Sequence, residues 1–487
     1  MAAKEFIVAI ELGSSKATGI AGKKNLDGSI TVNAIVKEDS STFIHKGVVY
    51  NIEKTAQCIT SIVNKLSMKM KTRIQKVYVG IGGQSIRSIL NVVPNDLPVD
   101  TLITQAMIDE LNDANYSMKY PDQEILDVAI QEFLVDNQLQ IDPVGIQCSH
   151  LEGNYLTILQ RKAFYDKLNN CLEVANISVA EMFLAPLALA DSVLTEAERR
   201  SGCALVDIGF DTTTVSVYSK NILRHLAVIP LGSNNITKDI ASLNIEESEA
   251  ERLKLKYASA YTEYKDIDEN LSIPIDAEHS VDSRKFIDIV EGRMQEIVEN
   301  VIYQIPQRYA DKLLGGIILT GGGANIPNIE KAFSTNHHHM DKTRIARTVT
   351  QTINSALPEL KQQDGTLCTI LGLLAKGDIN CAGGELSAAG DLFEPANTSM
   401  GTGNTEQVRI VRKPGELSPG TVQTAAEKKL AEEEADRLRK EKEAEQERLQ
   451  KEKEEKERRE RRENSLFFKG WKKIKEFGKV MTSPEEE

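Results

Sequence analysis

Residues 204–218 read ALVDIGFDTTTVSVY, an apolar run that ends at the acid Asp207, turns at Gly209 and continues as a second β-rich run. Tight turns of this kind direct backbone N–H groups and hydroxyls at phosphate oxygens, and the acid at the strand end can hold a hydrated magnesium ion. One such turn is a weak signal, because β-hairpins use the same residues. Its weight depends on whether similar turns follow other strands.

Two more glycine turns do follow predicted strands. Residues 10–16 read IELGSSK, and residues 319–324 read LTGGGA. The two acid-x-glycine turns, at Glu11 and Asp207, lie 196 positions apart (207 minus 11), and the Thr-Gly-Gly-Gly turn comes later in the chain. This combination is much more specific than any single turn. It predicts a phosphate-binding site built from three turns.

The first 385 residues alternate β-rich apolar runs with amphipathic helical stretches, which is the pattern of an α/β protein. The predicted strands are 6–10, 76–79, 204–207, 214–218 and 316–320. The predicted helices are 53–70, 166–175, 246–258 and 285–308. At 487 residues the chain is long enough for two or more domains.

The composition narrows the classes of function. The formal net charge is −13, and an acidic body argues against nucleic acid as the main partner, because phosphate binding needs clustered Lys and Arg. The six cysteines form no C-x-x-C pair, so a reducing cytoplasm fits better than a disulfide framework or a zinc site. The apolar run 6–10 is too short for a signal peptide, and the sequence holds no run of about 18 apolar residues that could span a bilayer.

The C-terminal hundred residues divide into parts of different composition. Residues 386–426 are rich in Gly, Ser, Thr and Pro, which predicts a disordered linker. Residues 427–463 are almost entirely charged, and pairs such as Glu433 with Arg437 place the acid four positions before the base, the favourable order along a helix. We interpret this stretch as a single solvated helix that acts as a spacer. A coiled coil is the alternative, although the leucines do not sustain a heptad.

Residues 466–481 have an amphipathic pattern at a helical period. Their large apolar side chains fall on one face and their lysines on the other, where they can meet anionic lipid headgroups. The residues expected to bind the membrane are Phe467, Phe468, Trp471, Lys472, Lys473, Ile474 and Phe477. The pattern predicts a helix that lies on a membrane, which makes the protein peripheral. The alternative is that this segment docks on the protein's own body.

With these features, the chain resembles the actin-like ATPase superfamily, whose two phosphate loops and adenosine loop match the three glycine turns. Within the superfamily, it resembles the FtsA family of bacterial cell division proteins. That resemblance rests on IDPVG at 141–145, IPLG at 229–232, NITKDIA at 235–241, AERLK at 250–254 and the terminal amphipathic helix. These markers extend over residues 5 to about 385 and the end of the chain.

The resemblance implies an α/β, actin-like two-lobed fold with a relocated small subdomain, followed by a flexible linker, a long charged helix and a C-terminal amphipathic helix. The implied divisions are the first lobe at 1–80 and 166–200, the relocated small subdomain for polymerisation and late partners at 81–165, the core of the second lobe at 201–241 and 311–348, the small subdomain of that lobe at 242–310, the return helices at 349–385, the linker at 386–426, the charged helix at 427–463 and the membrane-targeting end at 464–487.

The resemblance also implies that ATP and Mg²⁺ bind in a central cleft. The implied nucleotide-binding residues are Gly13, Ser14, Ser15, Lys16, Gly209, Thr212, Thr213, Gly232, Glu251, Lys254, Gly321, Gly322 and Gly323. Glu11 and Asp207 are implied to approach the metal.

Three departures from the superfamily pattern affect the expected mechanism. Glu11 stands where an Asp is usual, and Phe210 and Asp211 replace small residues in the second turn. Asp211 brings a negative charge where phosphate should approach, so we expect nucleotide affinity to suffer. Ala185 stands around the position where active relatives carry a water-orienting Gln or Glu. ATP hydrolysis is therefore expected to be slow at most.

The implied function is that of a cell division adaptor. Such a protein binds ATP, polymerises with further copies of itself, tethers the ring of the tubulin-like protein FtsZ to anionic lipids on the inner face of the membrane, and recruits later division proteins. Arg284, Lys285 and Arg293 are the candidate contacts for the C-terminal peptide of FtsZ. The alternatives are a catalytically active phosphotransferase or chaperone-type ATPase of the same fold, and an actin-like scaffold of a pilus or secretion system.

Overall fold

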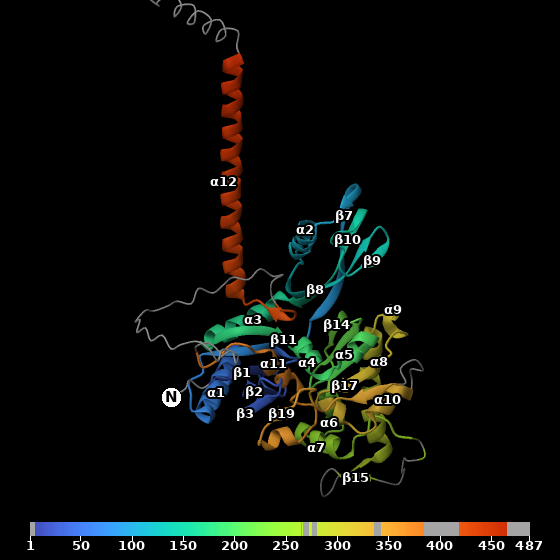
Figure 1. The fold of residues 1–487 in the computed structure, drawn as a ribbon. Helices are drawn as coiled ribbons and strands as arrows, with labels where there is room; N and C mark the ends of the chain where they lie inside the picture. The colour runs from blue at the N-terminus through green and yellow to red at the C-terminus, as the bar shows by residue number, and fades with distance from the viewer. Residues whose placement is uncertain are drawn as a thin grey trace, which may run out of the picture. The chain divides into compact units, whose positions relative to one another are not determined.

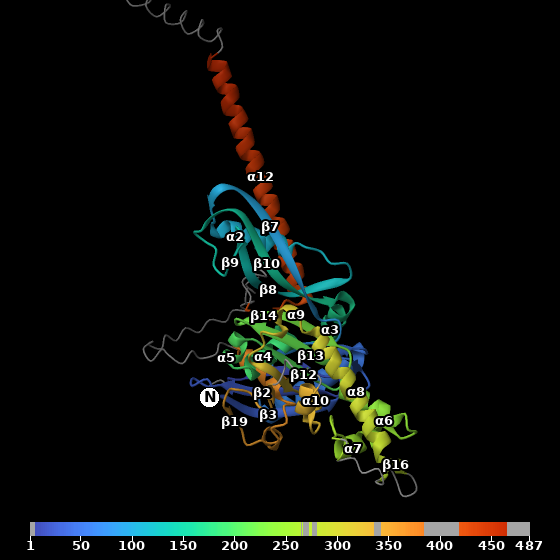
Figure 2. The same cartoon turned by 90° about the vertical axis from the view of Figure 1, so that its right-hand side faces the viewer.

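The protein is described here by a computed structural model, which covers residues 5–263, 265, 272–274, 280–335, 342–383 and 418–464. The residues expected to bind the membrane, 467–477, lie outside the described residues. Figures 1 and 2 show sheets and helices that form two lobes, a small subdomain and the long helix α12 (Ala425–Asn464). The body, which includes residues 418–424, and α12 are separate structural units.

The first lobe is built on a seven-stranded sheet in the order β19-β3-β2-β1-β6-β11-β20. Its strands are β1 (Ile7–Leu12), β2 (Lys16–Lys24), β3 (Ile30–Asp39), β6 (Lys76–Ile81), β11 (Ser178–Leu184), β19 (Ile353–Asn354) and β20 (Thr421–Val422), with a separate hairpin of β4 (Ile44–His45) and β5 (Val48–Val49). Its helices are α1 (Ile52–Met70), α3 (Lys162–Val174), α4 (Ala185–Val193) and α11 (Cys368–Lys376). α1 packs on β2 and β3, and α11 packs on β1, β2 and β6. β1, β6 and β11 are parallel, so their carboxyl ends share one edge of the sheet.

The second lobe occupies one part of a nine-stranded sheet, in the order β18-β17-β12-β13-β14. Its strands are β12 (Cys203–Ile208), β13 (Thr213–Ser219), β14 (Ile222–Ile229), β17 (Gly316–Thr320) and β18 (Thr343–Ile345), with a hairpin of β15 (Ser272–Pro274) and β16 (Ser280–Asp282). Its helices are α5 (Glu196–Ser201), α6 (Ser233–Ala241), α7 (Glu247–Tyr257), α8 (Ser283–Gln304), α9 (Gln307–Ala310) and α10 (Ile329–Thr335). α8 buries one stripe, with Phe286, Val290, Met294 and Ile297 at helical spacing, in the same hydrophobic core as Val206 and the other inward side chains of the sheet.

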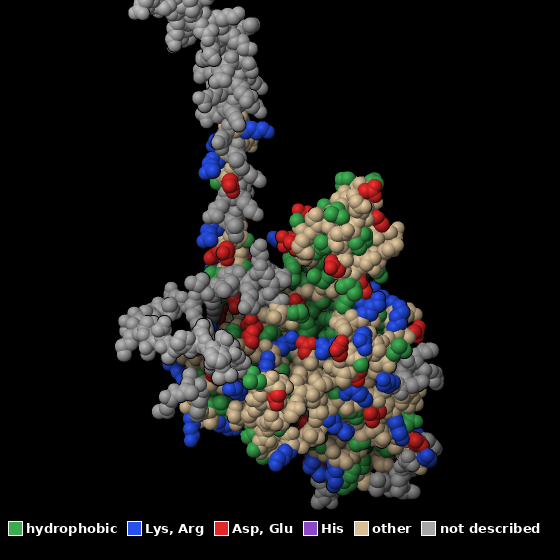
Figure 3. Space-filling model, viewed as in Figure 1, with side chains coloured by type: hydrophobic (Ala, Val, Ile, Leu, Met, Phe, Trp, Pro, Cys, Tyr) green, Lys and Arg blue, Asp and Glu red, His purple; other side chains and the backbone are tan. Residues whose placement is uncertain are grey.

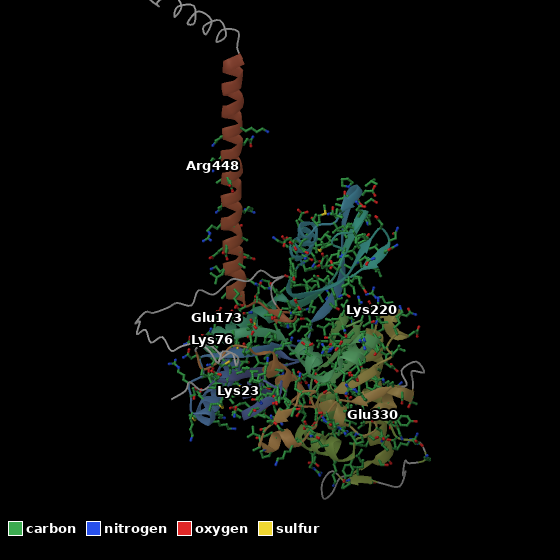
Figure 4. The ribbon with its side chains drawn as sticks, in the orientation of Figure 1. Lys23, Lys76, Glu173, Lys220, Glu330 and Arg448 are labelled. Atoms are coloured by element: carbon green, nitrogen blue, oxygen red, sulfur yellow. The ribbon has the colours of Figure 1, made fainter. Side chains whose placement is uncertain are left out.

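The small subdomain continues the same sheet in the order β14-β7-β10-β8-β9. It consists of β7 (Arg87–Leu102), α2 (Gln105–Tyr116), β8 (Gln123–Val135), β9 (Gln138–Gln140) and β10 (Gln147–Arg161). It has its own core, in which Ile108 and Leu111 of α2 join Phe133 and Tyr155 of the strands. The buried Arg224 of β14 holds the subdomain to the second lobe, because its two terminal nitrogens donate to the two Glu132 oxygens at 2.7 and 2.8 Å. Lys220, labelled in Figure 4, lies 3.6 Å from the same carboxylate.

The strands and helices predicted from the sequence are present, and one helix prediction is wrong at its end. The expected helix at 285–308 passes through Pro306, whereas α8 ends at Gln304 and a separate short helix begins at Gln307. Proline lacks a backbone N–H and disfavours the helical conformation of the residue before it, and Ile305 is indeed extended, with φ −78° and ψ 113°. The chain therefore turns after α8.

The predicted linker at 386–426 is also wrong at its end. Thr421 and Val422 form β20, which pairs with β11 at the edge of the first lobe's sheet. The long charged helix is confirmed, since α12 runs without a break over 40 residues (Figure 1). Its mixed acidic and basic side chains are visible in Figure 3. None of the described helices combines the length and apolarity that crossing a bilayer requires.

Candidate nucleotide-binding site

The first glycine turn connects β1 to β2. An ideal Cβ on Gly13 would lie 2.7 Å from the Lys16 carbonyl oxygen, so the turn is tight enough to require glycine. The Gly13 carbonyl accepts a hydrogen bond of 2.6 Å from the hydroxyl of the buried Ser40. Ser14 is buried, and its hydroxyl accepts from the Gly47 N–H at 2.7 Å. Of the predicted residues in this turn, Lys16 is exposed and Ser15 is half-buried.

The second turn connects β12 to β13 and rests on the beginning of α6. The Gly209 N–H donates to the Thr212 carbonyl at 2.8 Å and closes the turn. An ideal Cβ on Gly232 would lie 2.4 Å from the Phe210 carbonyl oxygen, which explains glycine at that position. Thr213 is fully buried, and its hydroxyl donates to the Leu231 carbonyl at 2.9 Å. The Thr213 hydroxyl therefore stabilises the turn from its buried side.

Asp211 forms a bond that crosses from the second lobe to the first. Its Oδ2 accepts from the backbone N–H of Lys46 at 3.1 Å, and its Oδ1 accepts from the side-chain amide of Asn234 at 2.9 Å. Lys46 lies between β4 and β5, next to Gly47, which contacts Ser14. The carboxylate that departs from the superfamily pattern thus joins the second turn to the β4–β5 hairpin, which contacts the first turn through Gly47 and Ser14.

The third turn follows β17 and packs directly on the second. Gly321 has φ +84°, and an ideal Cβ there would lie 2.3 Å from Asp207 Oδ1. An ideal Cβ on Gly323 would lie 2.4 Å from the side chain of Ile208. Gly322 between them is exposed, and its ideal Cβ would meet only the Thr366 methyl group, at an ordinary contact distance of 3.5 Å. The outer glycines of the turn thus allow close packing, whereas Gly322 leaves room on the open side.

Two acids come together where the turns meet. Burial and the neighbouring charge of Asp207 raise the pKa of Glu11 to about 8, against a smaller opposing effect of Lys37. Burial raises the pKa of Asp207 to about 6. Among the described residues, no Lys or Arg forms an ion pair with either carboxylate. These two carboxylates are therefore the residues at this place that could hold a divalent cation.

Glu251 and Lys254 of α7 lie in a network that joins α7 to α6. The Lys254 ammonium is buried, and it contacts the Ser233 carbonyl at 3.2 Å, the Thr237 hydroxyl at 2.9 Å and Glu251 at 2.7 Å. The Thr237 hydroxyl donates to Glu251 at 2.5 Å. These contacts use the three donors of the ammonium, so Lys254 holds the two helices together.

The sequence reasoning missed Asp364–Thr366, which lie against the third turn. Asn325 donates from its side-chain amide to the Asp364 carbonyl at 2.7 Å, and the Thr366 methyl group faces Gly322. Gly365 has φ +78°, and its ideal Cβ would lie 3.3 Å from the Gly321 nitrogen. The Asp-Gly pair at 364–365 is a turn signal that was available in the sequence. Its position beside the third turn was not.

The three predicted partner residues lie on α8 in different settings. Arg293 donates to both carboxylate oxygens of Asp239 on α6, at 2.5 and 3.1 Å, and also contacts Glu296. Its guanidinium is therefore already paired within the lobe. Lys285 is exposed in the first turn of the helix, and Arg284 is half-buried beside it.

Comparison with known proteins agrees with this architecture. The family model described as "Cell division protein FtsA" matches residues 204–362, and the one described as "SHS2 domain inserted in FTSA" matches residues 83–159. FtsA of Porphyromonas gingivalis is 31% identical over 329 residues, which are 66% of this chain and 68% of that protein. FtsA of Neisseria meningitidis is 32% identical over 327 residues, 66% of this chain and 78% of that protein. FtsA of Escherichia coli strain K12 is 26% identical over 398 residues, 78% of this chain and 92% of that protein.

One solved structure has a similar fold. The PilM-PilN type IV pilus biogenesis complex aligns over 76% of this chain and 97% of that chain, with a TM-score of 0.51 and 15% identity. The two sheets, the three turns at their junction and the inserted subdomain define an actin-like protein. Within that class, the chain belongs to the FtsA family of cell division proteins. Its role is in cell division.

Proposed function

We propose that this FtsA protein binds ATP with Mg²⁺ in the cleft formed by the three turns, and that it tethers FtsZ to the membrane. The single observation that carries the nucleotide proposal is the meeting of the three glycine turns around Glu11 and Asp207. The open side of Gly322 gives space for a ligand, and the two carboxylates suit a hydrated divalent cation, which prefers oxygen ligands.

The cleft suits binding better than rapid turnover. Asp211 bonds to Lys46 across the lobes and places a negative charge in the second turn, where phosphate oxygens would be held. α4 begins at Ala185, with Pro186 next to it, so this position offers no side-chain amide or carboxylate to orient an attacking water. We infer an ATP-binding structural protein whose hydrolysis is slow at most.

The tether is proposed from the sequence of residues 464–487, which begin at the last residue of α12. Burying each large apolar side chain in the lipid interface contributes roughly 1.5–3 kcal/mol, and each lysine near an anionic surface about 1 kcal/mol. A single copy should bind reversibly because the segment must also be ordered. Several copies in a filament bind more firmly, since each further attachment is intramolecular.

Exposed apolar side chains support a role of the small subdomain in polymerisation and in recruiting later division proteins. The subdomain surface drawn in Figure 3 carries many apolar groups. Val99, Leu139 and Ile141 are each more than 60% exposed. Exposed apolar surface is typical of protein interfaces where it is contiguous. The pilus-scaffold alternative has a structural neighbour in the PilM complex, but at 15% identity that likeness concerns the fold alone.

Equilibrium binding of labelled ATP tests the nucleotide proposal. We expect saturable binding at millimolar magnesium, and weaker binding when Mg²⁺ is removed. The Asp207→Asn variant should lose the magnesium dependence, because one of the two carboxylates is gone. Asp311→Asn, at an exposed residue after α9, is the matched control and should bind as the unchanged protein does. If the unchanged protein shows no saturable binding, the chain is a pseudo-ATPase and this part of the proposal is wrong.

A further inference from the structure

Residues 418–424, which we call the clasp, form an added strand on the first lobe. They come immediately before α12 and within the range where the sequence predicted a linker. Val422 pairs with Met182 and Thr421 pairs with Phe183, antiparallel, at the edge of the seven-stranded sheet. Val422 is 1% exposed and Thr421 6% exposed. A segment buried to this degree is part of the folded body.

The backbone of the clasp is held by four elements that are distant in sequence. The Leu184 N–H of β11 donates to the Gly420 carbonyl at 2.7 Å, and the Gly420 N–H donates to Asp127 Oδ2 of β8 at 2.8 Å. The Tyr165 hydroxyl of α3 donates to the Gln423 carbonyl at 2.6 Å. Lys376 of α11 approaches the Pro419 carbonyl at 3.4 Å. The clasp thus touches the first lobe and, through Asp127, the small subdomain.

Glycine at position 420 is required by the local geometry. Gly420 has φ +85°, a conformation that other residues adopt only with strain, and an ideal Cβ would lie 3.2 Å from the side chain of Leu187. The turn places its N–H on Asp127 and its carbonyl on the Leu184 N–H, which is how a two-residue strand can be anchored. The glycine at this position therefore fits the contacts that hold the segment to the body.

We propose that the clasp fastens the start of α12 to the body, so that the connection from body to membrane begins at Thr424 and not at Gly383. The reach of the tether is then set by α12, whose 40 residues span about 60 Å at ~1.5 Å per residue. Force applied along α12 is then transmitted to the sheet of the first lobe through β11, and to the small subdomain through Asp127. This inference rests on the proposed function only in that it takes a membrane to be bound beyond the C-terminal end of α12.

Pulsed electron spin resonance between two spin labels tests the clasp in solution. All six native cysteines are buried, so labels can be directed to Glu173→Cys at the end of α3 (Figure 4) and to Ser418→Cys in the clasp, both exposed positions. We expect one narrow distance distribution. Val422→Asp should at least double its width, whereas Leu314→Asp, at a residue that is 74% exposed, should leave it unchanged. A broad distribution in the unsubstituted background, or an unchanged one in Val422→Asp, overturns the proposal.

A milder variant covers the case in which Val422→Asp unfolds the body. Tyr165→Phe keeps the ring and removes the hydroxyl that donates to Gln423. We expect hydrogen exchange at the Gly420 amide to accelerate about two- to tenfold, the range for losing one hydrogen bond. Unchanged exchange there overturns the proposal. Neither measurement contains lipid, and a chain truncated after Glu463 should give the same distances. The two experiments therefore test the docking of the clasp separately from the proposed membrane binding.

Discussion

Two alanine substitutions at adjacent glycines separate the folding role of the third turn from its proposed binding role. At Gly321, alanine must adopt φ +84° and place a Cβ 2.3 Å from Asp207 Oδ1. Strain at such a backbone costs about 1–3 kcal/mol and overpacking about the same, so Gly321→Ala should lose about 2–6 kcal/mol of unfolding free energy. At Gly322 the added methyl meets only the Thr366 methyl group at 3.5 Å, which is ordinary contact. Gly322→Ala should therefore be as stable as the unchanged protein, within about 1 kcal/mol.

The same methyl group at Gly322 should interfere with nucleotide. If ATP occupies the open side of this turn, fitting one extra methyl costs about 1–3 kcal/mol, which is a roughly five- to 150-fold loss of affinity. Thermal unfolding measures the first effect, and titration with a fluorescent ATP analogue the second. The reasoning is refuted if Gly322→Ala binds ATP normally at full stability, since the open side would then not be where the nucleotide lies.

Three further predictions concern charge. Asp211→Gly should tighten ATP binding about tenfold in the same titration, because one negative charge leaves the second turn; equal or weaker binding contradicts the assigned role. Burial raises the pKa of Glu198, but hydrogen bonds from Arg344 and Thr195 outweigh it and lower the pKa to about 2. The ionised Glu198 therefore stabilises the folded protein fully above the unfolded pKa of 4.5, and this stabilisation is lost as the pH falls toward 2. In thermal melts, Glu198→Gln should cost about 2 kcal/mol of unfolding free energy at pH 7 and progressively less below pH 4.5. A cost that does not change with pH would contradict this prediction. In titrations with the C-terminal peptide of FtsZ, Lys285→Glu should weaken peptide binding at least fivefold and leave the stability of the protein unchanged. Arg293→Glu should chiefly lower the melting temperature, because the ion pair of Arg293 with Asp239 on α6 is lost. If Lys285→Glu binds the peptide normally, Lys285 is not part of the interface.

Much of the fold is readable from the sequence because its inner strands are buried on both faces. The runs 204–207 and 316–320 are continuous apolar segments bounded by turns, and they became the adjacent parallel strands β12 and β17. The three glycine turns were identified for the same reason: each ends such a run. The second and third turns lie together because the parallel strands β12 and β17 end at the same edge of one sheet, whereas the first turn follows β1 in the other sheet.

Contacts between distant elements could not be predicted. The resemblance implies that Lys254 is a nucleotide-binding residue. Two of its three partners lie on α6, and only the packing of α6 on α7 shows that its charge is already paired. The clasp is even harder to predict from the sequence, because a strand of only two residues in a stretch rich in Gly, Ser and Pro has almost no alternation of apolar and polar residues. Its anchor, Asp127, lies 293 positions before Gly420. A composition that predicts a linker says nothing of a docking point inside it.

The central claim is that this FtsA protein works by attachment, with a lysine-backed amphipathic terminus holding an actin-like body and FtsZ at a lipid surface. Co-sedimentation of FtsZ with anionic vesicles measures this directly, in the presence of the intact chain, of a chain truncated after Glu463, and of Trp471→Glu. We predict that the intact chain carries FtsZ to the vesicles and that both variants leave it in solution. Equal recruitment of FtsZ by all three would contradict the account.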